Sequence, residues 1–296
     1  MNLSKTELSK LWQTMTANHR HAKLAQSTNS ELMDALTQGQ IAHQTLHLYT
    51  ADQQSAGRGQ HGRSWISPQG NVFLSLYVPM STQAHDFGID QLSGLISLLV
   101  GFYLVKMPII EQINQMRMTK NLPTIGVKWA NDLGFIDQAH PKFHKLAGIL
   151  IEPIFKPINH HRTLMGLVIG VGLNVKNSPM IQNSLYESTS LSDLWQADEL
   201  PAAATLYQPI CEAICQAVAH HNQLTLAHHQ SLTEFVHEFN QVHVLTGRDV
   251  QVFLQDDREK ITHTGRCIGI NDQGALVLQT QQGEQSLFAG MVQLKS

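Results

Sequence analysis

The sequence is poor in cysteine and in charge. Cys211, Cys215 and Cys267 are the only cysteines among 296 residues, which excludes a disulfide framework. Cys211 and Cys215 stand four residues apart in an apolar helical run, so we expect buried free thiols and a chain that works in the reducing cytoplasm. Charged residues make up 15% of the chain and the formal net charge is −3. A protein that coats nucleic acid carries an excess of positive charge, so that role is disfavoured.

Long hydrophobic runs are also missing. The first residues contain no apolar segment of the kind found in signal peptides. The longest apolar stretch, from Leu92 to Val105, is interrupted by Ser and Gly and is too short to cross a membrane core of about 30 Å. We therefore expect no membrane association and a buried helix there. The 17 histidines are scattered and show no metal-ligand spacing.

Enough apolar residues are present, 42% of the chain, to bury a full core. Strand-like and helical runs interleave over residues 1–245, which predicts an α+β domain with a central mixed sheet flanked by helices. Helices are expected over 1–20, from Glu31, over 92–105, 202–221 and 229–240, and strands over 47–51, 71–78, 126–136, 146–152 and 164–170. Residues 246–296 hold short alternating runs, 249–254, 265–270 and 275–279, separated by turn signals, which predict a small SH3-like β barrel.

A loop from Gly57 to Pro68 combines glycines, arginines and a tryptophan. Glycine lets backbone N–H groups come close to an anion. Arg58 and Arg63 can each bind a carboxylate or phosphate through a planar fork, and Trp65 adds an apolar wall. A flexible surface loop or an arginine–glycine contact to nucleic acid explains the composition equally well, because glycine-rich matches are weakly specific.

Three further segments place polar or small residues in strand-like sequence. Lys128, Asn131 and Asp132 stand together at a strand end, where they fit phosphates and Mg²⁺ or an exposed turn. Lys145 heads a buried strand and either reaches over a ligand or extends to solvent. The run 168–175 contains two glycines, which mark a close approach to the strand or a bulge.

In this order the segments resemble the biotin protein ligases. Residues 27–29, Ser-Thr-Asn, are similar to the family's early motif, and residues 57–68 to its glycine- and arginine-rich loop. Residues 128–133 resemble its Lys-Trp-Pro-Asn-Asp-Leu motif, 145–152 its Lys-Leu-Ala-Gly-Ile-Leu-x-Glu motif, and 169–174 its Gly-x-Gly-x-Asn strand. The resemblance covers residues 24–296, with five motifs in one order.

The resemblance implies an enzyme that joins biotin to ATP and then transfers biotin to a lysine of a biotin carboxyl carrier protein, as biotin–[acetyl-CoA-carboxylase] ligases do. Two anions meet in the first step, so cations and N–H donors must neutralise them. The intermediate, biotinyl-5′-AMP, is a mixed anhydride that water would destroy, so the loop is expected to close over it. Family members also suggest a homodimer through the central sheet and an acceptor that extends a sheet edge.

The resemblance also assigns roles to individual residues. Arg58 and Lys145 are expected to act in catalysis, and Asp132 is the expected Mg²⁺ ligand. The expected biotin-binding residues are Ser27, Thr28, Asn29, Gln54, Gly57, Arg58, Gln60, Trp65, Lys145, Gly148, Gly170 and Gly172. The expected ATP-binding residues are Arg58, Arg63, Lys128, Asn131, Asp132, Lys145 and Asn174. The glycines are expected to leave room for biotin, and Trp65 to order the loop.

Three rival functions stay open at this point. A lipoate-type acyl ligase of the same fold would share the lysine-headed strand and an adenylate, although the loop favours biotin. A nucleic-acid adaptor would use the loop and the terminal barrel, with salt-sensitive binding and no use for Lys145. A catalytically dead regulator is disfavoured because Arg58, Lys128, Asp132 and Lys145 are all present.

Bacterial members with an N-terminal winged helix-turn-helix act as repressors. About 25 residues precede Ser27, too few for a three-helix DNA-binding domain, so we expect the ligase-only form without a nucleic-acid partner. Ala130 replaces the usual proline of its motif, which should matter little for charge. The segment 137–144 is longer than is typical of the family, and we expect a solvent-exposed insertion there.

Gln60 stands where many family members carry an arginine, and it generates a first prediction. We expect Gln60→Arg to slow the escape of biotinyl-5′-AMP several-fold, because the added guanidinium gives its phosphate a charge-assisted partner. The release rate of radiolabelled intermediate from the purified enzyme measures this. An unchanged rate would contradict the prediction.

Overall fold

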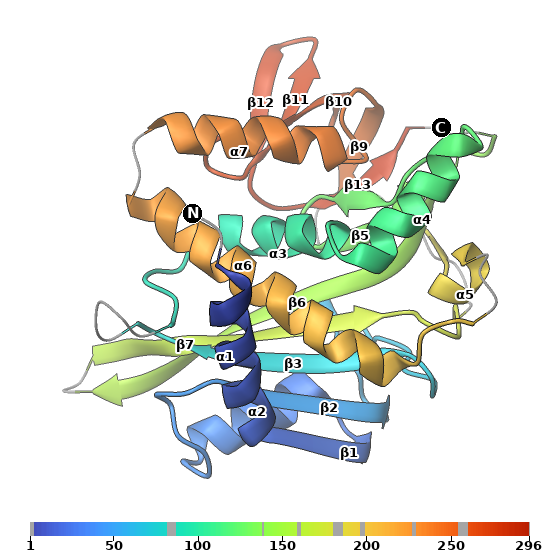
Figure 1. Ribbon diagram of the computed structural model, residues 1–296. Coiled ribbons are helices and arrows are strands. Elements are labelled where there is room, and N and C mark those ends of the chain that lie inside the picture. Colours follow the sequence, from blue (N-terminus) through green and yellow to red (C-terminus); the bar gives the residue numbers. More distant parts are fainter. Residues whose placement is uncertain are drawn as a thin grey trace.

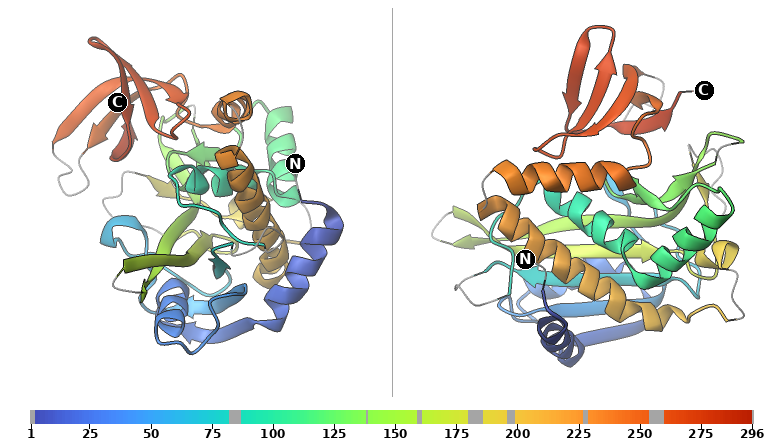
Figure 2. Two further views of the ribbon diagram at one scale, coloured as in Figure 1. Left: turned by 90° about the vertical axis from the view of Figure 1, so that its left-hand side faces the viewer. Right: turned by 45° about the horizontal axis from the view of Figure 1, so that its top comes forward.

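The structure, a computed structural model, describes residues 3–81, 87–137, 139–158, 161–179, 186–195, 199–226, 229–253 and 260–295. Two β-sheets organise these residues, with helices packed mainly around the larger one (Figure 1). The smaller sheet stands apart at the C-terminal end of the chain, as the two further views in Figure 2 show.

The elements have the following bounds. The helices are α1 (Lys5–Ala17), α2 (Thr28–Thr37), α3 (Leu95–Val105), α4 (Pro108–Thr119), α5 (Leu191–Leu194), α6 (Tyr207–Leu226) and α7 (His229–Val242), with 3₁₀ turns η1 (Gln60–Gly62) and η2 (Ala203–Leu206). The large sheet contains β1 (His19–Ala25), β2 (His47–Gln54), β3 (Val72–Pro79), β4 (Gly126–Lys128), β5 (Asp132–Ile136), β6 (Phe143–Ile158), β7 (His161–Leu173) and β8 (Glu187–Ser188). The small sheet contains β9 (Asp249–Phe253), β10 (Ile261–Ile270), β11 (Leu276–Thr280), β12 (Gly283–Leu287) and β13 (Met291–Leu294).

The topology confirms the predicted fold class. The large sheet has the order β1-β2-β3-β7-β6-β5-β4, with β8 added to β6. The β1–β2 and β6–β8 pairs are parallel and the others antiparallel, so the sheet is mixed. The C-terminal sheet is antiparallel with the order β12-β11-β10-β9-β13.

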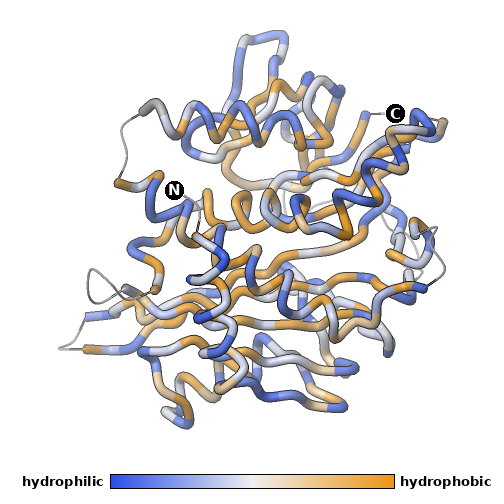
Figure 3. The backbone as a smooth tube through the Cα atoms, viewed as in Figure 1, coloured by the Kyte–Doolittle hydropathy of each residue, from blue (hydrophilic) through white to orange (hydrophobic). Residues whose placement is uncertain are grey.

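Alternation along the strands divides the side chains of the large sheet between two faces. Leu74, Ile169 and Val171 belong to the main hydrophobic core, together with residues of α3 and α6. Tyr77 and Val168 point the other way and pack with α2 in a smaller core. The strands at the centre and α3 are accordingly the most hydrophobic parts of the trace (Figure 3).

Helix α3 is apolar all round because it is enclosed by the sheet and by other helices. Nine of its eleven residues are buried, and each large apolar side chain taken out of water contributes about 1.5–3 kcal/mol. In the described residues no single helix is both long and apolar enough to span a membrane; α3 and α4 pass such a test only jointly, with a 66° bend between them.

The N-terminal helix α1 begins with a capping box between Ser4 and Glu7. Its apolar side packs on the core through the fully buried Met15. The backbone N–H of Leu3 donates to Gln216 Oε1 at 2.9 Å, and Gln216 Nε2 donates back to the Leu3 carbonyl at 2.8 Å. The described residues ahead of Ser27 thus form one helix and one strand, α1 and β1.

The connection between the two sheets is tied to strand β4 and the turn after it. The N–H of Val244 donates to the Val127 carbonyl at 2.9 Å. Trp129 donates its indole N–H to the Gly274 carbonyl at 3.0 Å and its backbone N–H to Nε2 of the buried His243 at 3.4 Å. The domain boundary that we predict at 245/246 falls in this connection, between α7 and β9.

Several elements differ from the sequence-based expectation. Residues 126–136 are not one strand: Lys128 pairs with Asp132 across a tight turn, so β4 and β5 form their own hairpin before β6. The strand β1, the helix α4 and the strands β8, β12 and β13 were not predicted. The predicted strand 249–254 ends at Phe253, and its last residue and the turn 255–257 lie outside the described residues.

The segment 137–144 is only partly an exposed loop. Phe143 is buried and begins β6. The His144 ring stacks on Phe135 at a centroid distance of 4.8 Å. The other described residues of this segment, 137 and 139–142, are partly or fully exposed. The three cysteines are buried and unpaired, as predicted.

Buried histidines generate a prediction about acid stability. Burial lowers the pKa of His243 to about 3, with nearby Lys128 acting in the same direction; burial also lowers the pKa of His47, His220 and His221. Below about pH 6.5 the unfolded chain therefore binds protons that the folded chain does not. The free energy of unfolding consequently decreases as the pH is lowered, by at most about 1.4 kcal/mol per pH unit per histidine.

Urea unfolding between about pH 7.5 and pH 5 measures this slope. We expect His243→Gln to flatten it, because the glutamine can still accept from Trp129 and does not titrate. The exposed His140 provides the control, since His140→Gln should leave the slope unchanged. A wild-type stability that is constant over this range would contradict the prediction.

Candidate active site

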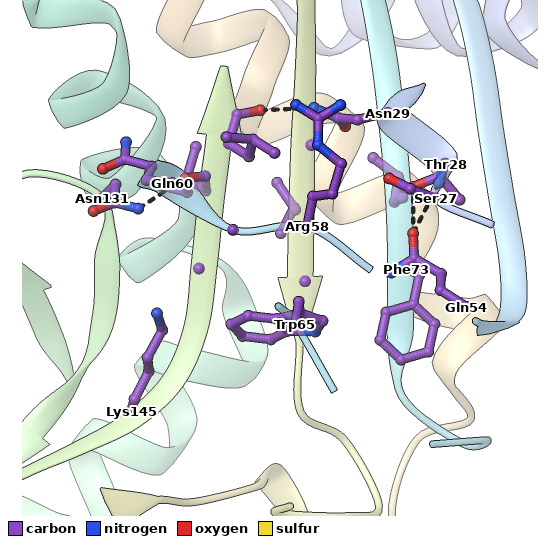
Figure 4. Close-up of a pocket in the computed structure, with 18 residues that line it drawn as sticks. Ser27, Thr28, Asn29, Gln54, Arg58, Gln60, Trp65, Phe73, Asn131 and Lys145 are labelled. Atoms are coloured by element: carbon purple, nitrogen blue, oxygen red, sulfur yellow. Dashed lines mark hydrogen bonds between the residues drawn. The ribbon is translucent and has the colours of Figure 1, made fainter. Parts of the chain in front are cut away.

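A cavity of about 460 Å³ lies on the α2 side of the large sheet (Figure 4). Strands β3, β7 and β6 form its floor, and the start of α2, the end of β2 and the loop 57–65 form its walls. Its lining residues are Ser27, Thr28, Asn29, Gln54, Arg58, Gly59, Gln60, Trp65, Phe73, Leu74, Asn131, Lys145, Gly148, Ile149, Leu150, Gly170, Val171 and Gly172. They include every residue expected to bind biotin except Gly57.

The first turn of α2 brings polar side chains to one end of this cavity. Ser27 is the N-cap: its backbone is extended and its Oγ accepts the N–H of Ser30 at 3.4 Å, as a serine before a helix predicts. Thr28 and Asn29 follow on the first turn and are buried. Gln54 Oε1 accepts from the Thr28 N–H at 2.8 Å and from the Thr28 hydroxyl at 3.2 Å.

Ser75 lies fully buried on β3 and links these side chains from below. Its Oγ is 2.8 Å from Thr28 Oγ1 and 2.5 Å from Asn29 Oδ1. The hydroxyls of Thr28 and Ser75 each have one proton to donate, and Gln54 Oε1 already accepts the Thr28 backbone N–H. The Thr28 hydroxyl can therefore donate to Ser75 and the Ser75 hydroxyl to Asn29, so this end of the cavity is a connected polar network that can both donate to and accept from a ligand.

Arg58 reaches from the loop to Glu152 on β6. The two side chains form an ion pair, and a second guanidinium nitrogen donates to Ser30 Oγ at 2.8 Å. The other oxygen of Glu152 accepts from Asn29 Nδ2 at 3.0 Å. Arg58 stays 43% exposed, and a guanidinium has five N–H donors, so donors remain for an anion in the cavity.

Trp65 lies directly on the sheet, over a pair of glycines. Gly148 and Gly172 are partners in the β6–β7 ladder. An added Cβ would come within 2.9 Å of the Trp65 ring at Gly148 and within 2.6 Å at Gly172. At Gly170 the added Cβ would lie 2.2 Å from Asn29 Oδ1.

The glycines therefore differ from the expectation that they leave room for biotin. Gly148, Gly170 and Gly172 make room for the side chains of Trp65 and Asn29, which in turn border the cavity. Gly57 makes room within the loop itself, where a Cβ would lie 2.5 Å from the Trp65 carbonyl oxygen. The structure agrees with the expected role of Trp65, since its indole holds the loop against the strands.

Two lysines face one carboxylate beside the cavity. Lys145 Nζ lies 2.7 Å from Asp132 Oδ1, an ion pair without an aligned hydrogen bond, and 5.1 Å from the Trp65 ring centroid. Lys128 is the partner of Asp132 in the β4–β5 ladder. Burial lowers the pKa of Lys128, while Asp132 raises it. Cations outnumber carboxylates here, which suits an anionic ligand.

A second cavity, of about 290 Å³, shares Trp65 and Lys145 with the first. Its lining residues are Ser64, Trp65, Ile66, Lys145, Asn174, Pro179, Tyr186 and Ser188. Asn174 is buried, and its Nδ2 donates to the Thr189 carbonyl at 3.0 Å. Its side chain thus holds the wall of this cavity in place.

Other expected site residues lie at or beyond the edge of the two cavities. Asn131 lines the first, with Nδ2 donating to the Ile149 carbonyl at 2.9 Å. Arg63, Lys128 and Asp132 line neither. Arg63 instead contacts the sulfur of Met291 in the C-terminal sheet.

Sequence reasoning did not identify two residues of this network, Glu152 and Ser75. Glu152 ends the motif that begins at Lys145, and it lies an even number of residues from Gly148, which places both on one face of β6. Ser75 is the one serine within the buried strand β3, which contains no threonine. Both features can be seen in the sequence, but the sequence does not show that Asn29 contacts both Glu152 and Ser75.

Asn71 is a third residue that the sequence did not single out. Its Oδ1 accepts the backbone N–H groups of Val175, Lys176 and Asn177 at 2.9–3.0 Å. It is buried and fixes the segment that follows β7, next to Asn174 and the second cavity.

The described residues contain no group of three His, Cys, Asp or Glu side chains placed to hold a metal ion. Mg²⁺ needs less from a protein, since it commonly takes one or two carboxylates and completes its shell with phosphates and water. Asp132 lies where such a carboxylate is needed, beside the two lysines. The donor set therefore fits a cation that arrives together with a phosphate ligand.

Comparisons with known proteins agree with this geometry. Residues 22–174 match the model of the biotin/lipoate A/B protein ligase family. The bifunctional ligase/repressor BirA of Escherichia coli K12 is 28% identical over 276 residues, covering 91% of this chain and 72% of that protein. The biotin–[acetyl-CoA-carboxylase] ligase of Mycobacterium tuberculosis is 30% identical over 169 residues, covering 57% and 52%.

Among solved structures, the biotin protein ligase from Aquifex aeolicus in complex with biotin and ATP has the same fold. It superimposes with a TM-score of 0.64 at 19% identity, covering 94% of this chain and 98% of that one. The likeness includes the mixed sheet with its flanking helices and the separate C-terminal sheet.

The stacking of Trp65 on glycine generates a prediction. We expect Gly172→Ala to lower the free energy of unfolding by about 1–3 kcal/mol, the usual cost of overpacking, because the methyl group would displace the indole. Urea unfolding measures the loss. Gly59→Ala, in the loop that carries Trp65, is the control, since its Cβ would meet no atom closer than 3.5 Å. Equal stability of both variants and the wild type would contradict the stacking.

Proposed function

The chain belongs to the biotin/lipoate A/B protein ligase family, and from this premise we propose that it is a biotin protein ligase. It activates biotin with ATP to biotinyl-5′-AMP and transfers the biotinyl group to a lysine of a biotin carboxyl carrier protein. The reaction forms a C–N bond, and the acceptor belongs to an acetyl-CoA carboxylase. The names of the relatives in Mycobacterium tuberculosis and Escherichia coli support this assignment.

The single observation that carries the choice of biotin is the group of polar side chains at one end of the first cavity, Thr28 and Asn29 on α2 and Gln54 on β2. Their hydroxyl and amide groups can both donate and accept hydrogen bonds. The ureido group of biotin offers two N–H donors and one carbonyl acceptor, whereas the dithiolane ring of lipoate offers neither. A ligand that leaves such buried polar groups unpaired loses affinity, so this end of the cavity favours biotin.

In the first step a carboxylate oxygen of biotin attacks the α-phosphorus of ATP. A new O–P bond forms, the bond to the bridging oxygen breaks, and pyrophosphate leaves. Arg58 and Lys145 reduce the repulsion between the two anions, because both are cations that line the first cavity. Lys145 also lines the second cavity, so it can contact the carboxylate and the α-phosphate together.

In the second step the ε-amine of the acceptor lysine attacks the acyl carbonyl of the adenylate, a C–N bond forms and AMP leaves. The intermediate must be kept from water until then. The loop serves this purpose. Its Trp65 indole lies on the strands that form the floor of the cavity, and its Arg58 side chain ties the loop to Glu152 on β6. Gln60 lines the same cavity from the loop.

The second cavity is the place that we assign to the nucleotide. Asn174 forms part of its wall, and the segment fixed by Asn71 follows Asn174 directly. We assign Lys128 and Asn131 to the phosphates. Mg²⁺, when bound with ATP, neutralises part of the phosphate charge, and Asp132 is the carboxylate that would hold it. Arg63 lies nearer the C-terminal sheet, and we assign it to closing the loop around ATP.

Partners and location follow from the same assignment. The acceptor protein adds a strand to a sheet edge near the site, and two copies of the chain associate through the central sheet. Nucleic acid has no role in the reaction. The buried free thiols suit a reducing compartment, and we place the reaction in the cytoplasm.

Pyrophosphate release from ATP and Mg²⁺ tests the proposed function. We expect release that depends on biotin and falls at least about 100-fold in Lys145→Ala, since removing one preorganised charge from a transition state has this order of effect. Lys106→Ala, at an exposed ion pair with Glu238, is the matched control and should behave as the wild type.

Two other outcomes would change the assignment. Release with lipoate in place of biotin would keep the family and overturn the substrate. No release with either acid would favour a binding protein, and the loop 57–63 would then be tested for salt-sensitive binding of nucleic acid.

A further inference from the structure

We propose that Glu152 is a positioning residue that holds Arg58 over the first cavity. This inference rests on the proposed function, in which Arg58 meets the carboxylate of biotin and the α-phosphate. Glu152 itself does not line the cavity; it acts through Arg58 and is fixed in place by Asn29.

The carboxylate of Glu152 joins three parts of the fold. It stands on β6, one oxygen pairs with Arg58 of the loop, and the other accepts from Asn29 Nδ2 of α2 at 3.0 Å. Both oxygens therefore have a donor, and the side chain is only 17% exposed. A carboxylate held on two sides and largely removed from water defines the position of its cation better than a surface pair does.

Asn29 is itself fixed in the orientation that Glu152 needs. Its Oδ1 lies 2.5 Å from Ser75 Oγ, and its Nδ2 lies 3.3 Å from the Leu150 carbonyl as well as 3.0 Å from Glu152. Turning the amide over would place Oδ1 against two acceptors. Gly170 supplies the space for this amide on the strand. A continuous path thus runs from Ser75 through Asn29 and Glu152 to Arg58.

The loop has few other polar ties to the sheet. Its backbone hydrogen bonds are internal, from Gly59 to Arg63 at 2.7 Å and from Trp65 to Gly57 at 2.8 Å. Among the ion pairs of the described residues, Arg58–Glu152 is the one that joins this loop to a strand. Loss of the Glu152 charge would leave Arg58 with the neutral Ser30 hydroxyl as its remaining partner among these contacts, which holds a guanidinium less firmly than a carboxylate does.

A positioned Arg58 has a kinetic signature. Biotin and its adenylate both meet Arg58, so loss of its position weakens the binding of both. The alternative is that Glu152 competes with the substrate for Arg58. In that case, removing the charge of Glu152 would strengthen the binding of biotin and its adenylate. The sign of the change in KM separates the two cases.

Glu152→Gln tests the proposal, because it keeps the shape of the side chain and removes the charge. We expect the KM for biotin to rise about tenfold and the escape of biotinyl-5′-AMP to accelerate about tenfold, the scale of one charge-assisted hydrogen bond, with a much smaller change in kcat. Glu238→Gln, at an exposed ion pair with Lys106, is the control and should change neither. A lower KM or an unchanged KM in Glu152→Gln would overturn the proposal.

A double-mutant cycle shows whether Glu152 acts through Arg58. In an Arg58→Gln background, Glu152→Gln should have no further effect on KM or on escape of the intermediate. Additive effects would overturn the proposal. If Glu152→Gln does not fold, as judged by thermal unfolding, Glu152→Asp replaces it in the same cycle, since the shorter side chain draws the carboxylate away from Arg58. A wild-type enzyme without biotin-dependent pyrophosphate release would instead refute the proposed function.

Discussion

The site depends on the absence of side chains along two neighbouring strands. Gly148 on β6 and Gly172 and Gly170 on β7 leave the α2 face of the sheet bare. An indole and an amide from elsewhere in the chain, Trp65 and Asn29, lie directly on the backbone there. Any residue with a Cβ would lift both away. The strands thus act as a flat base on which a loop and a helix end enclose a cavity.

Charge in the site is balanced in pairs. Arg58 faces Glu152, and Lys145 faces Asp132, so neither cation stands alone before a ligand enters. Partly buried ions without partners are costly, and the paired arrangement lets the fold keep two cations in a confined space.

The sequence predicted the fold best where the chain is strongly patterned. The apolar run that became α3, the dense β-formers of β3 and the alternation after residue 249 all led to the observed elements. Helix α4 was missed although Ile109, Ile110 and Ile113 are buried and Pro108 stands at its first position, because polar residues dominate the run. The β4–β5 hairpin was missed because β-forming residues on both sides of the turn at 129–131 favoured one strand over 126–136, although the Asn131–Asp132 pair left a turn open.

Motifs predicted the site, but not the contacts within it. Most of the residues that line the cavity stand at motif positions, whereas Gln54, Phe73 and Leu74 do not. The functions of the glycines could not be deduced, because a missing side chain does not say what fills its place. Glu152 needed Asn29 and Arg58 beside it, and those two are separated from it by more than ninety residues along the chain.

The two edges of the large sheet differ in whether their outer backbone groups are hydrogen-bonded. At β4 the connection to the C-terminal sheet occupies the ladder, since Val244 bonds to Val127. At β1, paired with β2 alone among the described strands, the exposed Arg20 and Lys23 stand on the open edge. Unpaired edges invite aggregation, and charged side chains oppose it. The connection thus closes the β4 edge by hydrogen bonding, while at the β1 edge exposed positive charge opposes uncontrolled strand pairing.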